Sequence, residues 1–169
     1  RKIWLWRCYY KTVFQESEEK ITYLISLTIS YLIGSIPFGY IITKLISNKN
    51  LHNIGSGSTG ATNVTRVLGL KVGIFVFFFD FSKGFITILL LSQMTTDPLL
   101  IALSSSSIVL GHCWPLFLKF KGGKGVAPGV GIFSAIAYEI VLIPVLLSLF
   151  LIYKTKTASI GSLIGAISS

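Results

Sequence analysis

The stretch VGIFVFFFDFSKGFITILLLS, residues 72–92, decides the fold class of this chain. About 20 consecutive apolar residues in a helix cross the hydrocarbon core of a bilayer, so this run is long enough to span a membrane. Its two charged residues, Asp80 and Lys83, stand three positions apart. That spacing places both on one helix face, where pairing reduces the cost of burying them. A structural ion pair is favoured over a catalytic role.

Composition extends this interpretation to the whole chain. Of its 169 residues, 52% are hydrophobic and only 12% are charged, whereas roughly 25% of residues are charged in soluble domains. The apolar runs 21–46 and 99–118 are also long enough to cross a bilayer. We therefore predict an all-α integral membrane protein, a polytopic helical bundle that forms one domain.

Two of the apolar runs contain breaks. The sequence GSIPFG (34–39) interrupts the first run and predicts either a kink or a backbone opening that lines a site. The run 126–153 is interrupted by Tyr138, Glu139 and Pro144, so it forms either one spanning helix or a hairpin of two half-length helices. The last run, 160–169, covers about half a membrane thickness, which predicts a chain truncated at its C-terminus.

The charged segments predict the domain boundary and the orientation. Residues 1–20 are charged and aromatic and are expected to be a tail, non-native to the domain or interfacial, before a membrane domain over 21–169. The net charge is +9, and beyond the head the basic residues gather in 44–71, 119–124 and 154–156, whereas 93–98 has none. Because cytoplasmic loops carry the excess of Lys and Arg, these basic segments are expected in the cytoplasm. That arrangement requires the hairpin and an external N-terminus. The head, with five basic and three acidic residues, argues against an external N-terminus, but the three internal segments agree with one another.

The polar connection contains GSGSTGATNVTR (55–66), whose glycines Gly55, Gly57 and Gly60 match the spacing of a dinucleotide-binding fingerprint. A Rossmann site needs a preceding strand, and here a membrane span precedes instead. Glycines still let backbone N–H groups converge on an anion. Ser56, Thr59, Thr62 and Asn63 add neutral donors, and Arg66 adds a charged fork. The stretch is either a phosphate-binding loop or a flexible loop.

A second basic, glycine-rich stretch follows the third apolar run. KFKGGKG (119–125) places Lys121 and Lys124 around Gly122 and Gly123. Lysine beside accessible amides suits phosphate, although a basic loop at a helix end also serves as a topological signal. Two such loops on one predicted side indicate a single site for phosphorylated substrates, and they are too compact for nucleic acid.

No conventional nucleophile or base accompanies these loops. The chain has two histidines, His52 and His112, and neither stands in a His-x4-Asp acyltransferase motif. No Gly-x-Ser-x-Gly elbow and no metal-ligand spacing occurs either. His112 follows Gly111 at a helix end, where a structural hydrogen bond and a catalytic role are both open.

Four segments together resemble one family, the membrane acyl-phosphate:glycerol-3-phosphate acyltransferases called PlsY. They are YLIGSIPFGYIITKL (31–45), NIGSGSTGATNVTRVLG (53–69), FFFDFSKGF (77–85) and GHCWPLFLKFKGGKGVA (111–127). The resemblance implies a seven-helix bacterial plasma-membrane protein, about six helices of which are represented here, with a site that opens to the cytoplasm. It also implies transfer of a fatty acyl group from acyl phosphate to the 1-hydroxyl of glycerol 3-phosphate, giving lysophosphatidic acid and phosphate in the first step of phospholipid synthesis.

Carried over by position, Ser56, Arg66 and Lys124 are similar to the phosphate-binding residues of the family. Supporting positions in the same motifs are Gly55, Gly57, Gly60, Thr62, Asn63, Lys121, Gly122, Gly123 and His112. The resemblance implies no dedicated protein base, no cofactor and no metal, because a substrate phosphate takes the proton. It implies glycerol 3-phosphate, acyl phosphate, membrane lipids and the enzyme that makes acyl phosphate as partners. Ser58 and Pro128 depart from the family pattern, which has Asn and Thr there.

Two other classes of protein compete with this hypothesis. A transporter or channel for small organic phosphates would also need basic glycine-rich loops and broken helices. It should, however, show an internal repeat and a site at the midplane, and the sequence has neither a convincing repeat nor midplane basic clusters. A degenerate membrane remnant is the third possibility, favoured only by the short C-terminal run.

Overall fold

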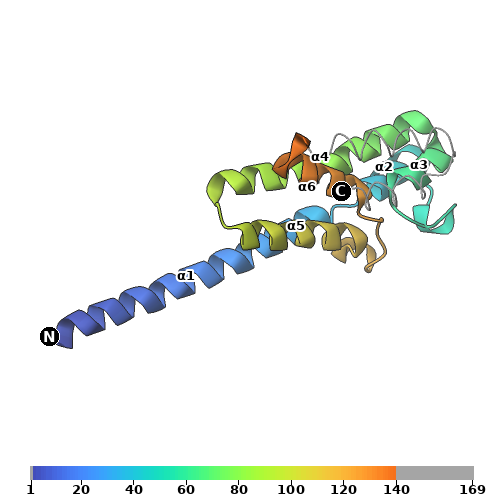
Figure 1. Cartoon of the computed structure of the whole chain (residues 1–169). Helices are drawn as coiled ribbons and strands as arrows, with labels where there is room; N and C mark the ends of the chain where they lie inside the picture. Colours follow the sequence, from blue (N-terminus) through green and yellow to red (C-terminus); the bar gives the residue numbers. More distant parts are fainter. Residues whose placement is uncertain (1, 140–169) are drawn as a thin grey trace.

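The computed structural model describes residues 2–139, with side chains from Glu16 onward. This part of the chain is built from helices alone, which confirms the all-α prediction. In chain order they are α1 (Lys2–Gly34), α2 (Phe38–Ser47), the short 3₁₀ helix η1 (Leu51–Asn53), α3 (Ala61–Leu68), α4 (Leu70–Met94), α5 (Pro98–Cys113), the 3₁₀ helix η2 (Leu116–Leu118) and α6 (Val126–Ile136). Figure 1 shows them as a bundle from which the N-terminal half of α1 projects.

Three helical segments are long and apolar enough to cross a membrane: Glu16–Ser47, Leu70–Met94 and Pro98–Leu118. They coincide with the three spans predicted from the sequence. In the apolar 18-residue window of each segment, 22–33% of the residues are buried inside the protein. Apolar side chains such as Phe78 and Leu90 are exposed on the outer surface of α4. Such a surface suits lipid rather than water.

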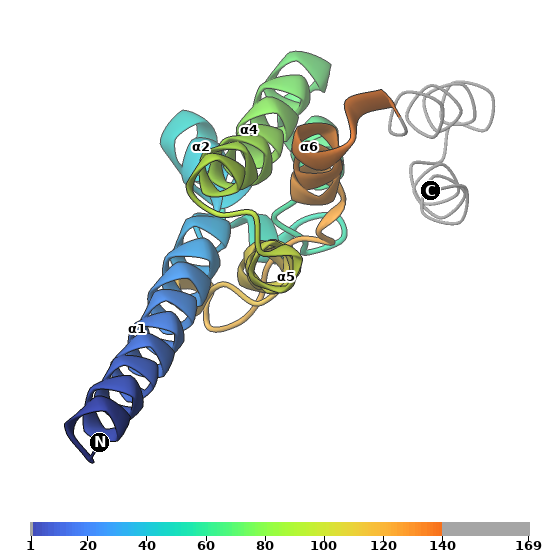
Figure 2. The same ribbon diagram turned by 60° about the vertical axis from the view of Figure 1, so that its left-hand side comes forward.

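The N-terminal head is helical. Residues 2–20, expected to be a tail, an interfacial segment or sequence not native to the domain, form the first part of α1 without a break before the apolar run. The whole helix is 33 residues long, and its first half lies beyond the bundle in Figures 1 and 2. The boundary between tail and membrane domain is therefore not marked by a break in the secondary structure.

The sequence GSIPFG forms a backbone opening. Helix α1 ends at Gly34 and α2 begins at Phe38, since Pro37 cannot continue the hydrogen-bond ladder. The carbonyl oxygens of Gly34 and Ile36 accept hydrogen bonds from Lys83 Nζ of α4, at 2.8 and 3.1 Å. A neighbouring helix thus satisfies the groups that the break sets free, as non-helical backbone inside a membrane requires.

Close helix contacts hold the bundle together. Helix α6 crosses α4 where Gly84 faces the Pro128 carbonyl and Gly131 faces the Phe81 carbonyl. A Cβ atom at either glycine would collide with that oxygen, so the two backbones touch as in other small-residue membrane interfaces. Beside this contact, Ile88, Ile108 and Ile132 form a buried apolar cluster between α4, α5 and α6.

The polar connection 47–71 is more ordered than a loop. It contains helix α3, which the sequence did not predict because its residues include weak helix formers such as Thr and Asn. Val64 of α3 is fully buried with Leu51 of η1 and Val76 of α4. Burying a side chain of this size contributes about 1.5–3 kcal/mol, and this packing anchors the connection on α4.

For residues 126–153 the sequence allowed one spanning helix or a hairpin of two half-length helices, and helix α6 bears on the first part of this segment. The helix ends at Ile136 after 11 residues, which is too short to cross a bilayer. This agrees with the first half of the predicted hairpin. The segments 140–153, 154–156 and 160–169 lie outside the described residues.

The connections of the bundle lie at two opposite ends. Residues 48–60 and 114–125 lie at the end where α2 and α3 are found, and the α4–α5 connection lies at the other end (Figure 1). At that other end, the Tyr23 hydroxyl of α1 donates a hydrogen bond to the Asp97 carboxylate. The two basic connections therefore share one end, and the connection without Lys or Arg lies at the other.

Candidate functional site

The glycine-rich loop is shaped around one buried amide. Asn63, on the first turn of α3, is only 1% exposed. Its Oδ1 accepts a hydrogen bond from Ser56 N at 3.1 Å, and its Nδ2 donates to the carbonyls of Ile54 and Ser58 at 3.0 and 2.9 Å. The loop turns with positive φ at Gly55 (62°) and Gly57 (70°), a conformation that glycine adopts without steric cost.

This network corrects one expected role. Asn63 was expected to offer its amide to an anion, but both hydrogens of Nδ2 point at backbone carbonyls of its own loop. An amide carries two donor hydrogens, so none is left over for a ligand. Asn63 fixes the shape of the loop, and Ser56 is the neighbouring side chain that remains available.

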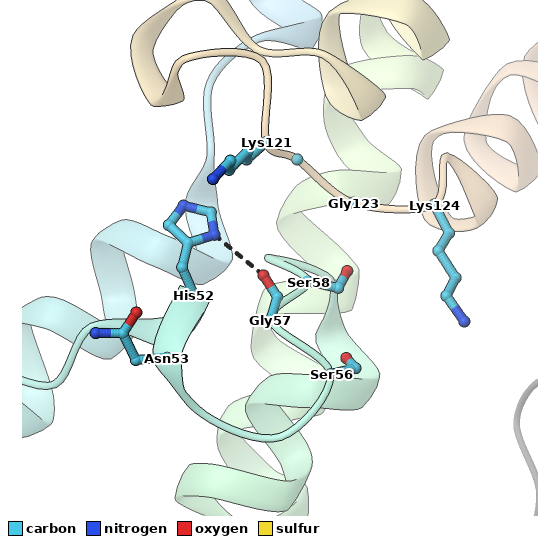
Figure 3. A pocket seen from close by; sticks show the side chains of 9 residues that line it. His52, Asn53, Ser56, Gly57, Ser58, Lys121, Gly123 and Lys124 are labelled. Carbon is cyan, nitrogen blue, oxygen red and sulfur yellow. Dashed lines mark hydrogen bonds between the residues drawn. The ribbon is translucent and has the colours of Figure 1, made fainter.

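The KFKGGKG stretch is fixed on the end of α5. Gly122 N donates to the Cys113 carbonyl at 3.1 Å, and Gly123 N donates to the His112 carbonyl at 3.0 Å. Gly123 also lies directly against the His112 ring, where a Cβ atom would collide with Nε2. The two glycines therefore hold the main chain flat on α5, and Lys121 and Lys124 project from either end of this flat segment (Figure 3).

The two glycine-rich loops meet. Thr59 N donates a hydrogen bond to the Gly122 carbonyl at 3.3 Å, which joins segments far apart in the sequence. A cavity of about 460 Å³ opens between the loops (Figure 3). The residues that line it are His52, Asn53, Ser56, Gly57, Ser58, Lys121, Gly122, Gly123 and Lys124.

The chemistry of this lining suits an anion. Lys121 and Lys124 contribute two exposed ammonium groups, and Ser56 and Ser58 contribute hydroxyls. Within the described part of the chain, no carboxylate lines the cavity. Lysine binds phosphate as a point charge, and glycine allows the backbone to approach closely. The cavity is thus electropositive and rich in donors.

Several predicted site residues lie outside this cavity. Gly55, Gly60, Thr62, Arg66 and His112 are not among its lining residues. Arg66 and Thr62 are exposed on α3, and Gly60 caps the start of that helix. The structure therefore brings Ser56 together with Lys121 and Lys124, and it leaves Arg66 in the last turn of α3, exposed and outside the cavity lining.

Beneath the KFKGGKG stretch lies a buried polar cluster of Asp80, Lys83 and His112. Lys83 Nζ is 2.9 Å from Asp80 Oδ1 and 2.9 Å from His112 Nδ1, and the three side chains are almost fully buried. An ammonium group only donates, so Nδ1 of His112 is the acceptor. His112 therefore supports the loop through its main chain and ring, and it adds a third member to the ion pair expected from the i, i+3 spacing.

Sequence reasoning missed three lining residues: His52, Asn53 and Ser58. His52 contacts the glycine-rich loop directly, because its Nδ1 lies 3.0 Å from the Gly57 carbonyl oxygen. The available signal was proximity, since His52 stands three positions before Gly55. Without the turn geometry, nothing in the sequence shows that the ring folds back onto the loop.

A sequence model of the family described as "Glycerol-3-phosphate acyltransferase" matches residues 24–169 of this chain. The chain belongs to this family. Curated glycerol-3-phosphate acyltransferases support the assignment. The protein of Prochlorococcus marinus (strain MIT 9312) is 40% identical over 144 residues, 85% of this chain and 73% of that protein. The protein of Aquifex aeolicus (strain VF5) is 43% identical over 141 residues, 83% of this chain and 73% of that protein.

Solved structures of glycerol-3-phosphate acyltransferases have the same fold. A crystal structure of PlsY, described as an integral membrane glycerol 3-phosphate acyltransferase in its glycerol 3-phosphate form, superposes with a TM-score of 0.83 at 41% identity. The match covers 87% of this chain and 74% of that one. The lysophosphatidic acid form gives a TM-score of 0.79 at 40% identity. This chain is therefore a multi-pass membrane acyltransferase, and the transporter hypothesis is not supported.

Proposed function

We propose that this acyltransferase takes its fatty acyl group from acyl phosphate and attaches it to the 1-hydroxyl of glycerol 3-phosphate, in the cavity between the two glycine-rich loops. The products are lysophosphatidic acid and inorganic phosphate, and the reaction is the first step of phospholipid synthesis. The related crystal structures, described as glycerol 3-phosphate and lysophosphatidic acid forms, support the acceptor and the product.

One observation carries the proposal: the hydrogen bond from Thr59 N to the Gly122 carbonyl joins two loops that each contribute phosphate-binding chemistry. One loop brings Ser56, and the other brings Lys121 and Lys124. Both the acceptor and the donor carry a phosphate, so the site must hold two anionic groups close together. Two ammonium groups and several donors offset the repulsion between them.

The chemical step needs positioning and charge stabilisation. The 1-hydroxyl oxygen attacks the acyl carbon, a new ester C–O bond forms, and the C–O bond to the phosphate breaks. The hydroxyl proton passes to the departing phosphate, so atoms and charge balance without a protein base. Lys124 and Ser56 stabilise the negative charge on the leaving phosphate, and Lys121 binds the phosphate of the acceptor. Neither a cofactor nor a metal ion takes part in this scheme.

Arg66 has a place in this proposal as a second-phosphate contact. It is the cationic residue of α3, on the helix whose first turn holds the Ser56 loop through Asn63. Its guanidinium is exposed and can reach a ligand that extends beyond the cavity. His112 contributes to the proposed site indirectly, because its carbonyl accepts a hydrogen bond from Gly123 N and so holds the loop that carries the two lysines.

The proposed setting is the bacterial plasma membrane, with the loops facing the cytoplasm. The support is the accumulation of Lys and Arg in the connections at the loop end of the bundle, against none in 93–98. Acyl phosphate then reaches the site from the lipid phase or from the enzyme that makes it. Residues 21–169 form the catalytic domain in this proposal, and residues 1–20 precede it.

Acyl transfer by the detergent-solubilised protein tests this proposal. Palmitoyl phosphate and glycerol 3-phosphate are supplied together, and phosphate release is measured alongside lysophosphatidic acid by mass spectrometry. We expect both products in equal amounts, and neither when glycerol 3-phosphate is left out. Palmitoyl coenzyme A as the only donor should give no product. Product from coenzyme A thioester but not from acyl phosphate would overturn the proposed donor.

A further inference from the structure

The His52 ring is held in one orientation. Its Nδ1 lies 3.0 Å from the Gly57 carbonyl oxygen, and a carbonyl only accepts, so Nδ1 carries the proton. On α2, the Tyr40 ring packs against the imidazole with centroids 5.4 Å apart. The ring is thus positioned by a hydrogen bond to the glycine-rich loop and by an aromatic contact.

The other ring nitrogen of His52, Nε2, is buried and has no hydrogen-bond donor among the described residues. With the proton on Nδ1, a neutral imidazole presents a lone pair at Nε2. Buried polar atoms in proteins are nearly always paired, so such an atom needs an explanation.

The second loop offers a candidate donor. His52 and Lys121 both line the cavity, and in Figure 3 the Lys121 side chain reaches toward the Nε2 edge of the His52 ring. An ammonium group has three hydrogens to donate and accepts none, which makes it complementary to the lone pair. Lys124, at the other end of the same flat segment, points elsewhere (Figure 3).

We propose that His52 is a positioning residue that holds the Lys121 ammonium at the cavity, with Nε2 of His52 accepting a hydrogen bond from Lys121 Nζ. The contact continues from the Gly57 carbonyl through the imidazole to Lys121, so it links the two loops through side chains, beside the main-chain bond from Thr59 to Gly122. The consequence for binding of glycerol 3-phosphate rests on the proposed function, whereas the contact itself does not.

A chemical labelling experiment tests the contact without any need for activity. The detergent-solubilised protein is treated with limiting acetic anhydride, and acetylation of each lysine is quantified by mass spectrometry. Lys119, Lys121 and Lys124 are all exposed, but a hydrogen bond to Nε2 occupies the Lys121 amine, so Lys121 should react more slowly than the other two lysines of the same loop. The two neighbours are internal controls for folding and reagent.

Two substitutions of His52 test the roles of its two ring nitrogens separately. His52→Asn keeps a donor near the position of Nδ1 and removes the acceptor at Nε2, so Lys121 should become several-fold more reactive while Lys124 stays unchanged. His52→Gln places an amide oxygen near the position of Nε2 and should preserve the protection. Unchanged Lys121 reactivity in His52→Asn, with wild-type thermal stability, would overturn the proposal. A parallel rise at Lys119 and Lys124 would also overturn it, because the loop as a whole would have loosened.

A double-mutant cycle tests the consequence for the reaction. His52→Asn and Lys121→Met should each raise KM for glycerol 3-phosphate several-fold with a smaller effect on kcat, and the double variant should be no worse than Lys121→Met alone. Effects that multiply would show that His52 does not act through Lys121. If the wild-type protein transfers no acyl group, the proposed function fails, and the labelling result still decides whether the contact exists.

Discussion

At the residue scale, Asn63 shows how a polar side chain serves a site without touching a ligand. Its amide binds the backbone of the glycine-rich loop at several points and is almost fully buried. A loop rich in glycine has high conformational entropy, and fixing it in advance lowers the cost of binding. The effect of Asn63 on the site is therefore indirect.

Asn63→Ala should lower both stability and substrate binding. The change removes hydrogen bonds worth about 0.5–1.5 kcal/mol each and leaves Ser56 N and two carbonyls unpaired. We expect a loss of about 2–4 kcal/mol in the free energy of unfolding, seen as a lower thermal midpoint in detergent. Asn53→Ala, at an exposed position of the same segment, is the stability control. Equal thermal midpoints for the two variants would contradict this role.

Lys124 and Arg66 should affect the reaction differently. Lys124→Ala removes a charge at the cavity, and a charge-assisted contact contributes about 1.5–3 kcal/mol, so kcat/KM should fall roughly 10- to 100-fold. Arg66→Ala should raise the concentration of glycerol 3-phosphate needed for half-maximal rate steeply. Initial rates over a range of glycerol 3-phosphate concentrations measure both effects. An unchanged dependence in Arg66→Ala would remove Arg66 from the site, in keeping with its position outside the cavity.

The sequence predicts residue types at this site better than it predicts contacts. Ser56, Lys121 and Lys124 stood out because charge and hydroxyl groups beside glycine indicate phosphate. His52 did not stand out, because its role depends on a ring folding back onto Gly57, five positions later. Such a contact depends on turn angles that composition does not specify.

At the scale of elements, hydropathy predicts spans and misses short helices. The run 72–92 became α4, with a few more residues at each end. Helix α3 was missed because only eight residues form it, and its stability comes from packing Val64 against α4 rather than from propensity. The GSIPFG break was identified from Pro and Gly, but its partner Lys83 lies on a different helix and could not be identified.

The α4–α6 contact provides a matched pair of glycine substitutions. Gly131→Ala places a methyl group against the Phe81 carbonyl of α4, whereas Gly129→Ala on the same helix meets open space. Overpacking costs typically about 1–3 kcal/mol, so Gly131→Ala should lower the thermal midpoint in detergent. Gly129→Ala should leave it unchanged or raise it, because Ala favours helix. Similar midpoints for both variants would show that the helices separate readily.

The contact between α1 and the α4–α5 connection should depend on pH. The Tyr23 hydroxyl that donates to Asp97 holds the pKa of this carboxyl below its ordinary value of 3.8. Its contribution to stability is therefore complete above that ordinary value and is lost as the pH falls through the lowered value. Asp97→Asn keeps a cap for α5 and removes the titration. The difference in thermal midpoint between wild type and Asp97→Asn should shrink from neutral pH to about pH 3; a constant difference would contradict the link.

At the scale of the whole molecule, the decisive feature is that two loops separated by two long helices meet at one end of the bundle. Charge patterning placed both on the same predicted side, but their hydrogen bond depends on how α3, α4 and α5 pack. Packing angles depend on three-dimensional contacts such as those of Gly84 with α6, which have no one-dimensional signature. Which loops share a side was predictable, and how they meet was not.

The proposed orientation can be tested in intact cells. In a background with Cys8→Ser and Cys113→Ala, single cysteines replace Thr96 or Lys49, which are exposed in the connections at opposite ends. A membrane-impermeant maleimide should label Thr96→Cys directly and Lys49→Cys only after permeabilisation. The reverse pattern would place the cavity on the outer face. Activity of each variant serves as the folding control.

Three of the nine residues that line the cavity are glycines, so part of its wall is main chain. Gly122 and Gly123 have no room for a side chain against the end of α5, and Gly57 has a positive φ. A compound that recognised these amides and carbonyls would bind features that a point mutation cannot redesign without distorting the loop itself. An inhibitor of this enzyme built on main-chain contacts would therefore leave a cell few routes to resistance, in contrast to one that relied on the lysine side chains alone.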